Sequence, residues 1–313
     1  MTILITGASG YLGRHLLERL ESEDVDFIAL DWSRKSFEIK NFVEGSFFDL
    51  QMMERIFSKN NIHKIIHLAA LKDVSEALLH PSKYLEQNFK GTQDFFEFAA
   101  IHGVSKFVFA SSAAVYGNLN TLNGHKESGG VDPSNAYGES KLLGETFLEQ
   151  LCQRNDVRGV SLRFFNLGGA RDAILPDLDG NNLIPRLIRA SNLQSQFGVY
   201  GGSYPTIDGT ALRDYVHVDD VVDAIMRSLF LLDSEIRHEI LNIGSAEPKS
   251  VLEVIDAINS LTNQKIRYNL IDPREGDPYS SFADISKARD VLKWFPKKSF
   301  EDLIFSYSSF FEK

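Results

Sequence analysis

The residues Ile3-Leu4-Ile5-Thr6-Gly7-Ala8-Ser9-Gly10-Tyr11-Leu12-Gly13 stand near the start of a chain of 313 residues. The apolar run at 3–5 predicts a strand, and leucines at positions 12, 16, 17 and 20 predict a helix with one apolar side. Glycines between a strand and a helix let the backbone approach a pyrophosphate, and the helix N-terminus offers unpaired N–H groups. The spacing G-x-x-G-x-x-G therefore predicts a nucleotide-binding βα unit, although a tight turn without a ligand would satisfy the same pattern.

An acidic residue closes the second predicted strand, which covers residues 26–30 and ends at Asp31. At this distance from the glycines, a carboxylate would hydrogen-bond the ribose of an adenosine and would repel a 2′-phosphate. The pattern therefore favours NAD as the cofactor. Arg34 and Lys35 follow closely, and they leave NADP open as the alternative.

Strands and helices alternate through the first half of the chain. Further strands are predicted at residues 42–45, 64–68, 106–110, 159–164 and 239–243, and helices at 49–59, 82–101 and 139–154. This alternation predicts an α/β fold with a Rossmann-type, doubly wound parallel sheet, whose ligands bind at the carboxyl ends of the strands. The loops that begin at Ala69 and Ser111 should therefore face the cofactor.

The amino-acid composition of the sequence changes after Phe165. Loops rich in Gly, Pro, Asn and Asp cover residues 166–182 and 198–209, and helical patterns follow at 218–232, 251–261 and 300–311. We expect an NAD-binding Rossmann domain over residues 1–165, with a return segment near 214–244. A smaller mixed α/β substrate-binding domain is expected over residues 166–213 and 245–313.

A candidate acid–base group lies in the predicted helix at 139–154 and just before it. Tyr137 and Lys141 are spaced so that their side chains project from one helical face. A tyrosine has a pKa near 10, and a nearby cation favours its phenolate form. Ser112, at the end of the strand at 106–110, could polarise a carbonyl or an alkoxide beside Tyr137. An exposed helical face and a serine that only satisfies backbone groups remain the alternatives.

Composition argues against several classes of protein, including nonspecific nucleic-acid-binding, disulfide-bonded and membrane proteins. The net charge of −10 argues against nonspecific nucleic-acid binding. The single Cys152 excludes an intramolecular disulfide, has no metal-ligand spacing around it, and suits a reducing compartment. The apolar run at 216–232 is broken by aspartates, and no basic leader precedes the first strand. We therefore expect a cytoplasmic protein with no metal site and no membrane segment.

Several motifs together resemble a known family. The segments are Gly7-x-x-Gly10-x-x-Gly13, His67-Leu68-Ala69-Ala70-Leu71-Lys72, Ser111-Ser112-Ala113-Ala114-Val115-Tyr116-Gly117, Tyr137-x-x-x-Lys141, Leu162-Arg163-Phe164-Phe165-Asn166, Asn181-Asn182-Leu183-Ile184-Pro185, Tyr204-Pro205-Thr206-x-Asp208-Gly209-Thr210, Arg213-Asp214-Tyr215-Val216-His217-Val218 and Arg274-Glu275-Gly276-Asp277. Nearly end to end, the chain resembles the extended short-chain dehydrogenases/reductases, and within them the UDP-glucose (UDP-galactose) 4-epimerases.

The resemblance implies a role for individual residues. Tyr137 would be the base, Lys141 would bind the nicotinamide ribose, and Ser112 would contact the 4-oxygen of the sugar. The implied NAD-binding residues are Gly7, Gly10, Tyr11, Leu12, Gly13, Asp31, Leu68, Ala69, Ala70, Lys72 near the pyrophosphate, Asn88, Tyr137, Lys141 and Phe164. The implied UDP-sugar-binding residues are Ser112, Tyr137, Asn166, Asn182, Leu183, Tyr200, Arg213, Arg274, Asp277 and Ser281.

The chain departs from the family pattern on the cofactor side. It is about a dozen residues shorter just after Asp31, Ser46 replaces an Asp that contacts adenine in the family, and Phe164 replaces a Tyr. These departures concern how firmly NAD is retained. They leave the expected chemistry unchanged.

The reaction expected from the resemblance is the interconversion of UDP-glucose and UDP-galactose through a 4-keto sugar. Related dehydratases place an acid and a base where this chain has Ala113 and Ala114, so hydride removal and return at one carbon is favoured. An epimerase of a UDP-uronic acid or UDP-pentose, and a catalytically idle NAD-binding regulator, remain the alternatives.

Two finer expectations concern assembly and substrate range. The apolar helices at 84–101 and 142–151, together with the family's habit of pairing through them, predict a homodimer. Phe89, Phe95, Phe96, Phe98 and Phe147 supply most of this apolar content. The small Ser281 would leave room for a 2-acetamido group, which predicts use of the N-acetylated sugars. Tyr279 could instead fill that space.

Overall fold

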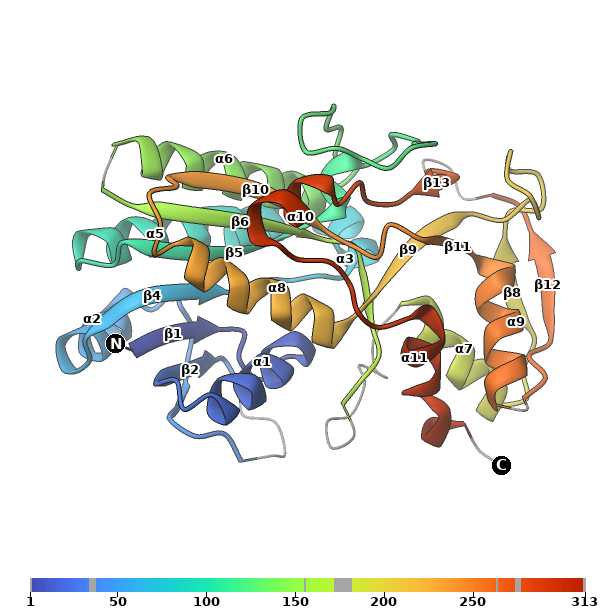
Figure 1. The fold of residues 1–313 in the computed structure, drawn as a ribbon, viewed down its shortest axis with the longest axis horizontal. Helices are drawn as coiled ribbons and strands as arrows, with labels where there is room; N and C mark the ends of the chain where they lie inside the picture. Colours follow the sequence, from blue (N-terminus) through green and yellow to red (C-terminus); the bar gives the residue numbers. More distant parts are fainter. Residues whose placement is uncertain are drawn as a thin grey trace. The chain divides into compact units, whose positions relative to one another are not determined.

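A seven-stranded sheet organises the first part of the chain, in the order β10-β6-β5-β4-β1-β2-β3 (Figure 1). The computed structural model describes residues 2–33, 38–154, 156–171, 182–262, 264–273 and 277–311. The strands are β1 (Thr2–Thr6), β2 (Phe27–Asp31), β3 (Phe42–Glu44), β4 (Ile62–His67), β5 (Lys106–Ser112), β6 (Arg158–Phe164) and β10 (His238–Ile243). The pairs β1–β2, β1–β4, β2–β3 and β4–β5 are parallel. The predicted Rossmann-type sheet is confirmed.

The helices that accompany this sheet are α1 (Tyr11–Ser22), α2 (Leu50–Lys59), α3 (Val74–Leu79), α4 (Pro81–Tyr84), α5 (Gly91–Ile101), α6 (Ala136–Arg154) and α8 (Val218–Leu231). The helices predicted at 49–59, 139–154 and 218–232 lie within three residues of their expected bounds, and α3 was not predicted. Asp49 starts α2 because its carboxylate accepts the Met52 N–H at 3.0 Å. The short 3₁₀ segment η2 (Ala113–Tyr116) follows β5 directly.

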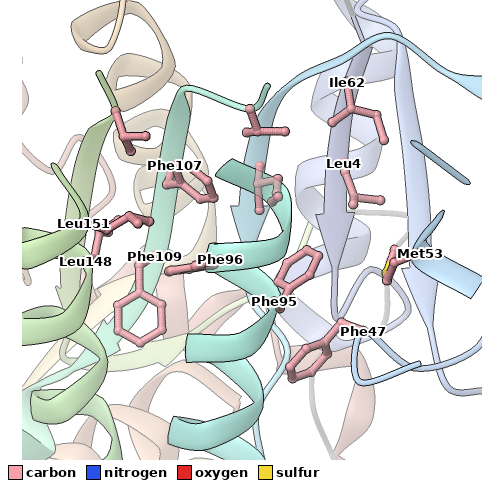
Figure 2. Close-up of a cluster of buried hydrophobic side chains, with 14 of the residues drawn as sticks. Leu4, Phe47, Met53, Ile62, Phe95, Phe96, Phe107, Phe109, Leu148 and Leu151 are labelled. Carbon is pink, nitrogen blue, oxygen red and sulfur yellow. The ribbon is translucent and has the colours of Figure 1, made fainter. Parts of the chain in front are cut away.

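Side chains alternate between the two faces of the sheet. On one face, Leu4, Phe107 and Phe109 pack with Phe96 of α5 and Leu148 of α6 in a buried apolar cluster, as Figure 2 shows. On the other face of β1 lie Ile3 and Ile5, and Figure 1 draws α1 and α8 there. Buried strands covered on both faces explain the nearly continuous apolar runs in this part of the sequence.

The helix predicted over residues 82–101 is interrupted. Between α4 and α5 the chain widens into the π-helical segment η1 (Leu85–Lys90). The wide turn contains Asn88, which is buried and hydrogen-bonds in both directions with the backbone of Leu71 at 2.8 Å. A π-turn shifts the register of the residues around it, and such turns are frequent at functional sites.

The second part of the chain builds two small sheets. One has the order β11-β9-β13 with β7 paired to β9, and the other pairs β8 with β12. Its elements are β7 (Asn166–Gly168), α7 (Leu183–Asn192), β8 (Phe197–Tyr200), β9 (Leu212–His217), β11 (Pro248–Ser250), α9 (Val251–Thr262), β12 (Tyr268–Ile271), β13 (Ser280–Ser281), α10 (Ser286–Leu292) and α11 (Phe300–Phe305). A separate apolar core includes Leu187, Ile255 and Ile304.

The predicted helix at 300–311 is too long. The helix α11 ends at Phe305, and a 3₁₀ turn, η3 (Ser308–Phe310), follows. Tyr307 lies between them, is 2% exposed, and accepts the Gly169 N–H on its hydroxyl at 3.0 Å. Burial of this side chain competes with continuation of the helix.

The described chain divides into two compact units. Unit 1 comprises residues 1–115, 133–163 and 222–241, and unit 2 comprises 116–132, 164–221 and 242–313. This division groups residues 116–132 and 214–221 with unit 2, whereas the sequence pattern assigned them to the first domain. Every helix within the described ranges is too short or too polar to cross a membrane.

Candidate active site

The glycine turn brings β1, α1 and the end of β4 into close contact. Gly7 has a φ of +71°, a conformation that favours glycine, and a Cβ on it would lie 2.7 Å from the Ala69 nitrogen. A Cβ on Gly13 would lie 2.4 Å from the Gly7 oxygen. Gly10 precedes the first turn of α1, which Tyr11 and Leu12 begin. Glycine at these positions therefore lets strand, turn and helix pack closely. The N–H groups at the N-terminus of the helix are suited to binding an anionic group.

Asp31 stands beside this turn, as its position in the sequence predicted. One carboxylate oxygen accepts the Ser9 N–H at 2.9 Å and the Ser9 hydroxyl at 2.7 Å, and the other accepts the Trp32 N–H at 2.8 Å. Ser9 was not among the predicted site residues. Its place between two of the glycines was the signal that could have identified it.

The segment after β4 also lies at the glycine turn. Leu68 donates its N–H to the Thr6 oxygen at 3.1 Å, and Ala69 and Ala70 follow it. The side-chain amide of Asn88 accepts the Leu71 N–H and donates to the Leu71 carbonyl. Asn88 therefore fixes the loop that ends in the exposed Lys72. The structure therefore gives Asn88 a contact within the protein in addition to the predicted one with the cofactor.

The three predicted catalytic residues meet at the carboxyl end of β5. The Ser112 side chain lies beside Tyr137, and Lys141 Nζ lies 5.9 Å from the centroid of the Tyr137 ring. Lys141 also donates to the Ala110 carbonyl at 2.7 Å. A Cβ on Gly138 would lie 2.4 Å from the Ala114 oxygen, so this glycine allows α6 to pack closely on η2.

Burial shifts the acid–base behaviour of both helix residues. Burial raises the pKa of Tyr137, although the neighbouring Ser112 side chain acts in the opposite direction. Burial lowers the pKa of Lys141 to about 7, against the effect of the nearby Glu145 carboxylate. The protein alone therefore keeps Tyr137 in its phenol form at neutral pH, and an added positive charge would favour the phenolate.

A second group of polar residues lies next to these three. The Ser111 hydroxyl donates to the Glu145 carboxylate, which forms a buried ion pair with Arg163. Glu145 was not predicted, although its position one helical turn after Lys141 could have indicated it. Phe164, which follows Arg163 and ends β6, is 9% exposed.

The predicted UDP-sugar residues of unit 2 fall into separate elements. Arg213 of β9 donates to Asp277 at 2.6 Å, and Ser281 of β13 pairs in register with Arg213. Asn166 begins β7, which also pairs with β9. Tyr200 ends β8 and is half-buried. These contacts bring together Arg213, Asp277 and Ser281.

The remaining predicted substrate residues lie elsewhere in unit 2. Asn182 is the residue before α7 and does not cap the helix with its side chain, and Leu183 is the first helical residue. Arg274, predicted to bind UDP, lies outside the described residues, as do Arg34 and Lys35.

Asp214 organises this part of unit 2 and was missed by the sequence reasoning. Its buried carboxylate accepts backbone N–H groups of Ser245 at 2.6 Å, Ala246 at 3.1 Å and Ala283 at 3.0 Å. Burial raises the pKa of Asp214, and these hydrogen bonds oppose the rise. Asp214 thus ties the turn after β10 and the segment after β13 to β9, which presents Arg213.

The model of the NAD dependent epimerase/dehydratase family matches residues 3–244. A UDP-glucose 4-epimerase of Lacticaseibacillus casei is 34% identical over 97% of this chain and 93% of its own length. A UDP-glucose 4-epimerase of Stenotrophomonas maltophila, solved with NAD and formylated UDP-arabinopyranose, is 30% identical, with a TM-score of 0.93 over 99% of this chain and 97% of that one.

A third similar protein differs in the substrates its description gives. The UDP-Glc/GlcNAc 4-epimerase of Campylobacter jejuni is 30% identical, with a TM-score of 0.86 over 99% of this chain and 98% of that one. Both the fold and the sequence therefore match over nearly the whole length of each protein. The chain belongs to the NAD dependent epimerase/dehydratase family.

Proposed function

We propose that this protein is an NAD-dependent UDP-hexose 4-epimerase that interconverts UDP-glucose and UDP-galactose. The observation that carries the proposal is that Ser112 and Lys141 both lie beside Tyr137, with Lys141 Nζ 5.9 Å from the Tyr137 ring. Ala113 and Ala114 follow directly in η2 and cannot transfer a proton. This set of side chains supports proton transfer at one oxygen and offers no second acid or base for elimination.

The glycine turn fits NAD. A Cβ at Gly7 or Gly13 would clash with neighbouring backbone, so glycine at both positions allows the close packing of strand, turn and helix that a dinucleotide-binding turn requires. Gly10, Tyr11 and Leu12 would hold the pyrophosphate at the N-terminus of α1, and Asp31 the adenosine ribose. NAD bound there would supply the hydride acceptor and then the hydride donor for one sugar carbon, so the reaction would have no net redox change.

Tyr137 is the proposed base. Its hydroxyl oxygen would take the proton of the sugar 4-hydroxyl, and Ser112 would hold the same 4-oxygen through its hydroxyl. Lys141, held by the Ala110 carbonyl, would bind the nicotinamide ribose and favour the phenolate of Tyr137 through its charge. When the proton returns from Tyr137, the 4-hydroxyl is restored on the opposite face of the ring.

Inversion requires that the sugar turn over while its nucleotide stays in place. Arg213, Asp277 and Arg274 would hold the UDP part, with Asn182 and Leu183 at the start of α7. Arg213 is positioned for this role because Asp277 fixes one of its terminal nitrogens at 2.6 Å. Few polar anchors around the hexose would then permit its 4-keto form to rotate about the pyrophosphate linkage.

The proposal extends to the N-acetylated sugars because of Ser281. Its small side chain sits in β13, directly across from Arg213 in β9. A relative of similar structure is described as a UDP-Glc/GlcNAc 4-epimerase, which supports this breadth. Tyr279, two residues earlier and half-buried, is the alternative: its ring could fill the space that a 2-acetamido group would need.

We also propose a cytoplasmic homodimer that pairs through α5 and α6. Most of the phenylalanines that motivated this expectation pack inside unit 1, since Phe95 and Phe96 are 0% exposed and Phe147 is 5% exposed. The proposal therefore depends on the family's habit and on Ile101, which ends α5 and is 82% exposed. A monomer by light scattering at micromolar concentration would overturn it.

The test of the function is direct. Purified protein is incubated with UDP-glucose or UDP-galactose, and the equilibrium mixture is measured from both sides. The cofactor released by denaturation is identified, with NAD as the expected result. Tyr268→Phe is a matched control because this exposed tyrosine lies in β12, outside the proposed catalytic residues. Failure to interconvert the two sugars in the parent protein would refute the function.

A further inference from the structure

A buried ion pair beside the catalytic residues has no role in the steps described above. Glu145 of α6 is 1% exposed and Arg163 of β6 is 3% exposed. Arg163 Nε donates to Glu145 Oε1 at 2.9 Å, and Arg163 Nη2 donates to Oε2 at 2.7 Å. A two-point contact of this kind fixes the orientation of both side chains.

The pair is linked to the candidate catalytic residues on both sides. The Ser111 hydroxyl donates to Glu145 Oε1, and Ser111 is the residue immediately before Ser112. Lys141 lies one turn before Glu145 on the same face of α6, and its Nζ donates to the Ala110 carbonyl at 2.7 Å. The helix therefore holds the end of β5 at two successive residues, Ala110 and Ser111.

We propose that Glu145 and Arg163 are a positioning pair for the proposed epimerase reaction, holding Ser112 in place through Ser111 and supplying the negative charge that faces Lys141. This inference rests on the proposed function. Neither residue touches the reacting atoms. Their effect on catalysis would pass through Ser112, Lys141 and, by way of Lys141, Tyr137.

Stability alone is a weak reason for such a pair. Removing two charges from water costs free energy, and buried pairs can often be replaced by apolar side chains without loss of stability. The location of this pair supplies a different reason. Burial lowers the pKa of Lys141 to about 7 even though Glu145 raises it, so the ammonium form of Lys141 depends on the Glu145 carboxylate.

The other charged and titratable neighbours of Lys141 do not replace Glu145. Tyr137 lies on the same helix, and Arg163 of β6 is bound to Glu145. His67 of β4 has a pKa well below its ordinary value because of burial and the charge of Lys141, so it stays neutral. Loss of Glu145 would therefore lower the fraction of charged Lys141 at neutral pH. Tyr137 would then lose the charge that favours its phenolate.

The experiment compares three variants with the parent protein. Glu145→Met combined with Arg163→Met removes both charges together, so that neither is left buried and unpaired. Ser111→Ala removes only the link to β5. Glu149→Gln is the matched control, since Glu149 is an exposed carboxylate on the same helix. Melting temperature and circular dichroism establish that each variant is folded.

Two readouts separate positioning from a structural role. The first is the pH profile of kcat and KM with UDP-glucose, where the double variant should lose about 10- to 100-fold in kcat with KM little changed. The rising limb of its kcat profile should move to higher pH. The second is the phenolate absorbance of Tyr137 in the NAD-loaded protein, taken as the difference from Tyr137→Phe, whose midpoint should also rise.

Each outcome decides one of the two proposals. A folded double variant with the parental kcat, pH profile and phenolate midpoint would overturn the positioning role. If the double variant does not fold, Ser111→Ala decides, and an unchanged kcat there would overturn it. If the parent does not interconvert UDP-hexoses but the phenolate midpoint still shifts, the proposed function fails and the pair's action on Lys141 and Tyr137 stands.

Discussion

Unit 1 and unit 2 hold their candidate residues by different means. In unit 1, Ser112, Tyr137 and Lys141 project from the ends of a seven-residue strand and a nineteen-residue helix, and buried polar contacts surround them. In unit 2, Arg213 lies on a strand of six residues, Asp277 lies in a loop, and Ser281 lies on a strand of two residues. Long regular elements hold side chains more precisely than loops do.

Chemistry and substrate binding can therefore be divided between the two units. Proton and hydride transfer depend on distances fixed to a fraction of an ångström, which suits groups anchored in the core. Binding a nucleotide while a sugar turns over requires firm contacts at one end and room at the other. Short elements joined by loops can supply both. Substitutions in unit 1 should therefore act mainly on kcat, and those in unit 2 on KM and substrate choice.

The largest effect is expected for Tyr137→Phe. Loss of a positioned acid–base group should reduce kcat by about 10²- to 10⁴-fold, with KM and retained NAD little changed. Steady-state kinetics and the NAD content of the purified protein measure this. Near-parental turnover in the variant would contradict the expectation that the chemical step depends on unit 1.

Arg213→Ala should act on binding. Removal of the guanidinium that Asp277 orients at 2.6 Å should raise KM for UDP-glucose by about 10- to 100-fold, with a much smaller change in kcat. Arg227→Ala is the control, because this arginine pairs with Asp223 within α8. A loss confined to kcat would place Arg213 in the catalytic step. It would contradict the expectation that substitutions in unit 2 act on KM.

Ser281→Tyr should change the substrate range. A phenol ring in place of a hydroxymethyl group takes up on the order of 100 Å³, and a packed site yields such space only at a cost. We expect the parent to use UDP-N-acetylglucosamine, and the variant to lose about tenfold in kcat/KM for that sugar relative to UDP-glucose. If the ratio stays constant, Ser281 is not the gate, and Tyr279→Ser becomes the variant to test.

The smallest expected effect concerns the stability of unit 1 in acid. His67 hydrogen-bonds Thr6 Oγ1 at 2.7 Å and Thr92 Oγ1 at 2.9 Å, and burial together with the charge of Lys141 holds its pKa well below 6.5. Below pH 6.5 the unfolded chain takes up a proton at His67 that the folded chain does not. The free energy of unfolding should therefore fall as pH decreases, by up to about 1.4 kcal/mol per pH unit.

The measurement is chemical denaturation between pH 7.5 and pH 5. His67→Gln keeps a donor and an acceptor but cannot titrate, so its stability should depend less on pH in this range. His80→Gln is the control, because His80 is exposed. Parallel curves for the parent and His67→Gln would show that His67 does not contribute to the acid sensitivity.

Much of unit 1 could be predicted because its signals are local. The apolar run at 3–5, the glycines at 7, 10 and 13 and the aspartate at 31 all belong to one continuous βαβ unit. Tyr137 and Lys141 share a helical face by spacing alone. These local signals did not predict the π-turn around Asn88, because the contact that Asn88 makes is with the backbone of Leu71, in the loop after β4.

The polar residues that were missed have long-range partners. Glu145 has a function in the structure only because β6 brings Arg163 to it and β5 brings Ser111. Asp214 matters because Ser245 and Ala283 approach it from distant parts of the sequence. A lone carboxylate in a sequence does not show which backbone groups or cations will surround it.

Periodicity, glycine spacing and motif residues were enough to determine the class of fold, the position of the glycine turn proposed to bind NAD and the identity of the proposed base, since each depends on residues close together in the chain. Tertiary structure alone decided which charges are buried, which backbone N–H groups a carboxylate receives, and how far burial moves the pKa of Tyr137 and Lys141. The physical reason is that desolvation and hydrogen bonding depend on everything packed around a group, and most of those neighbours are distant in sequence.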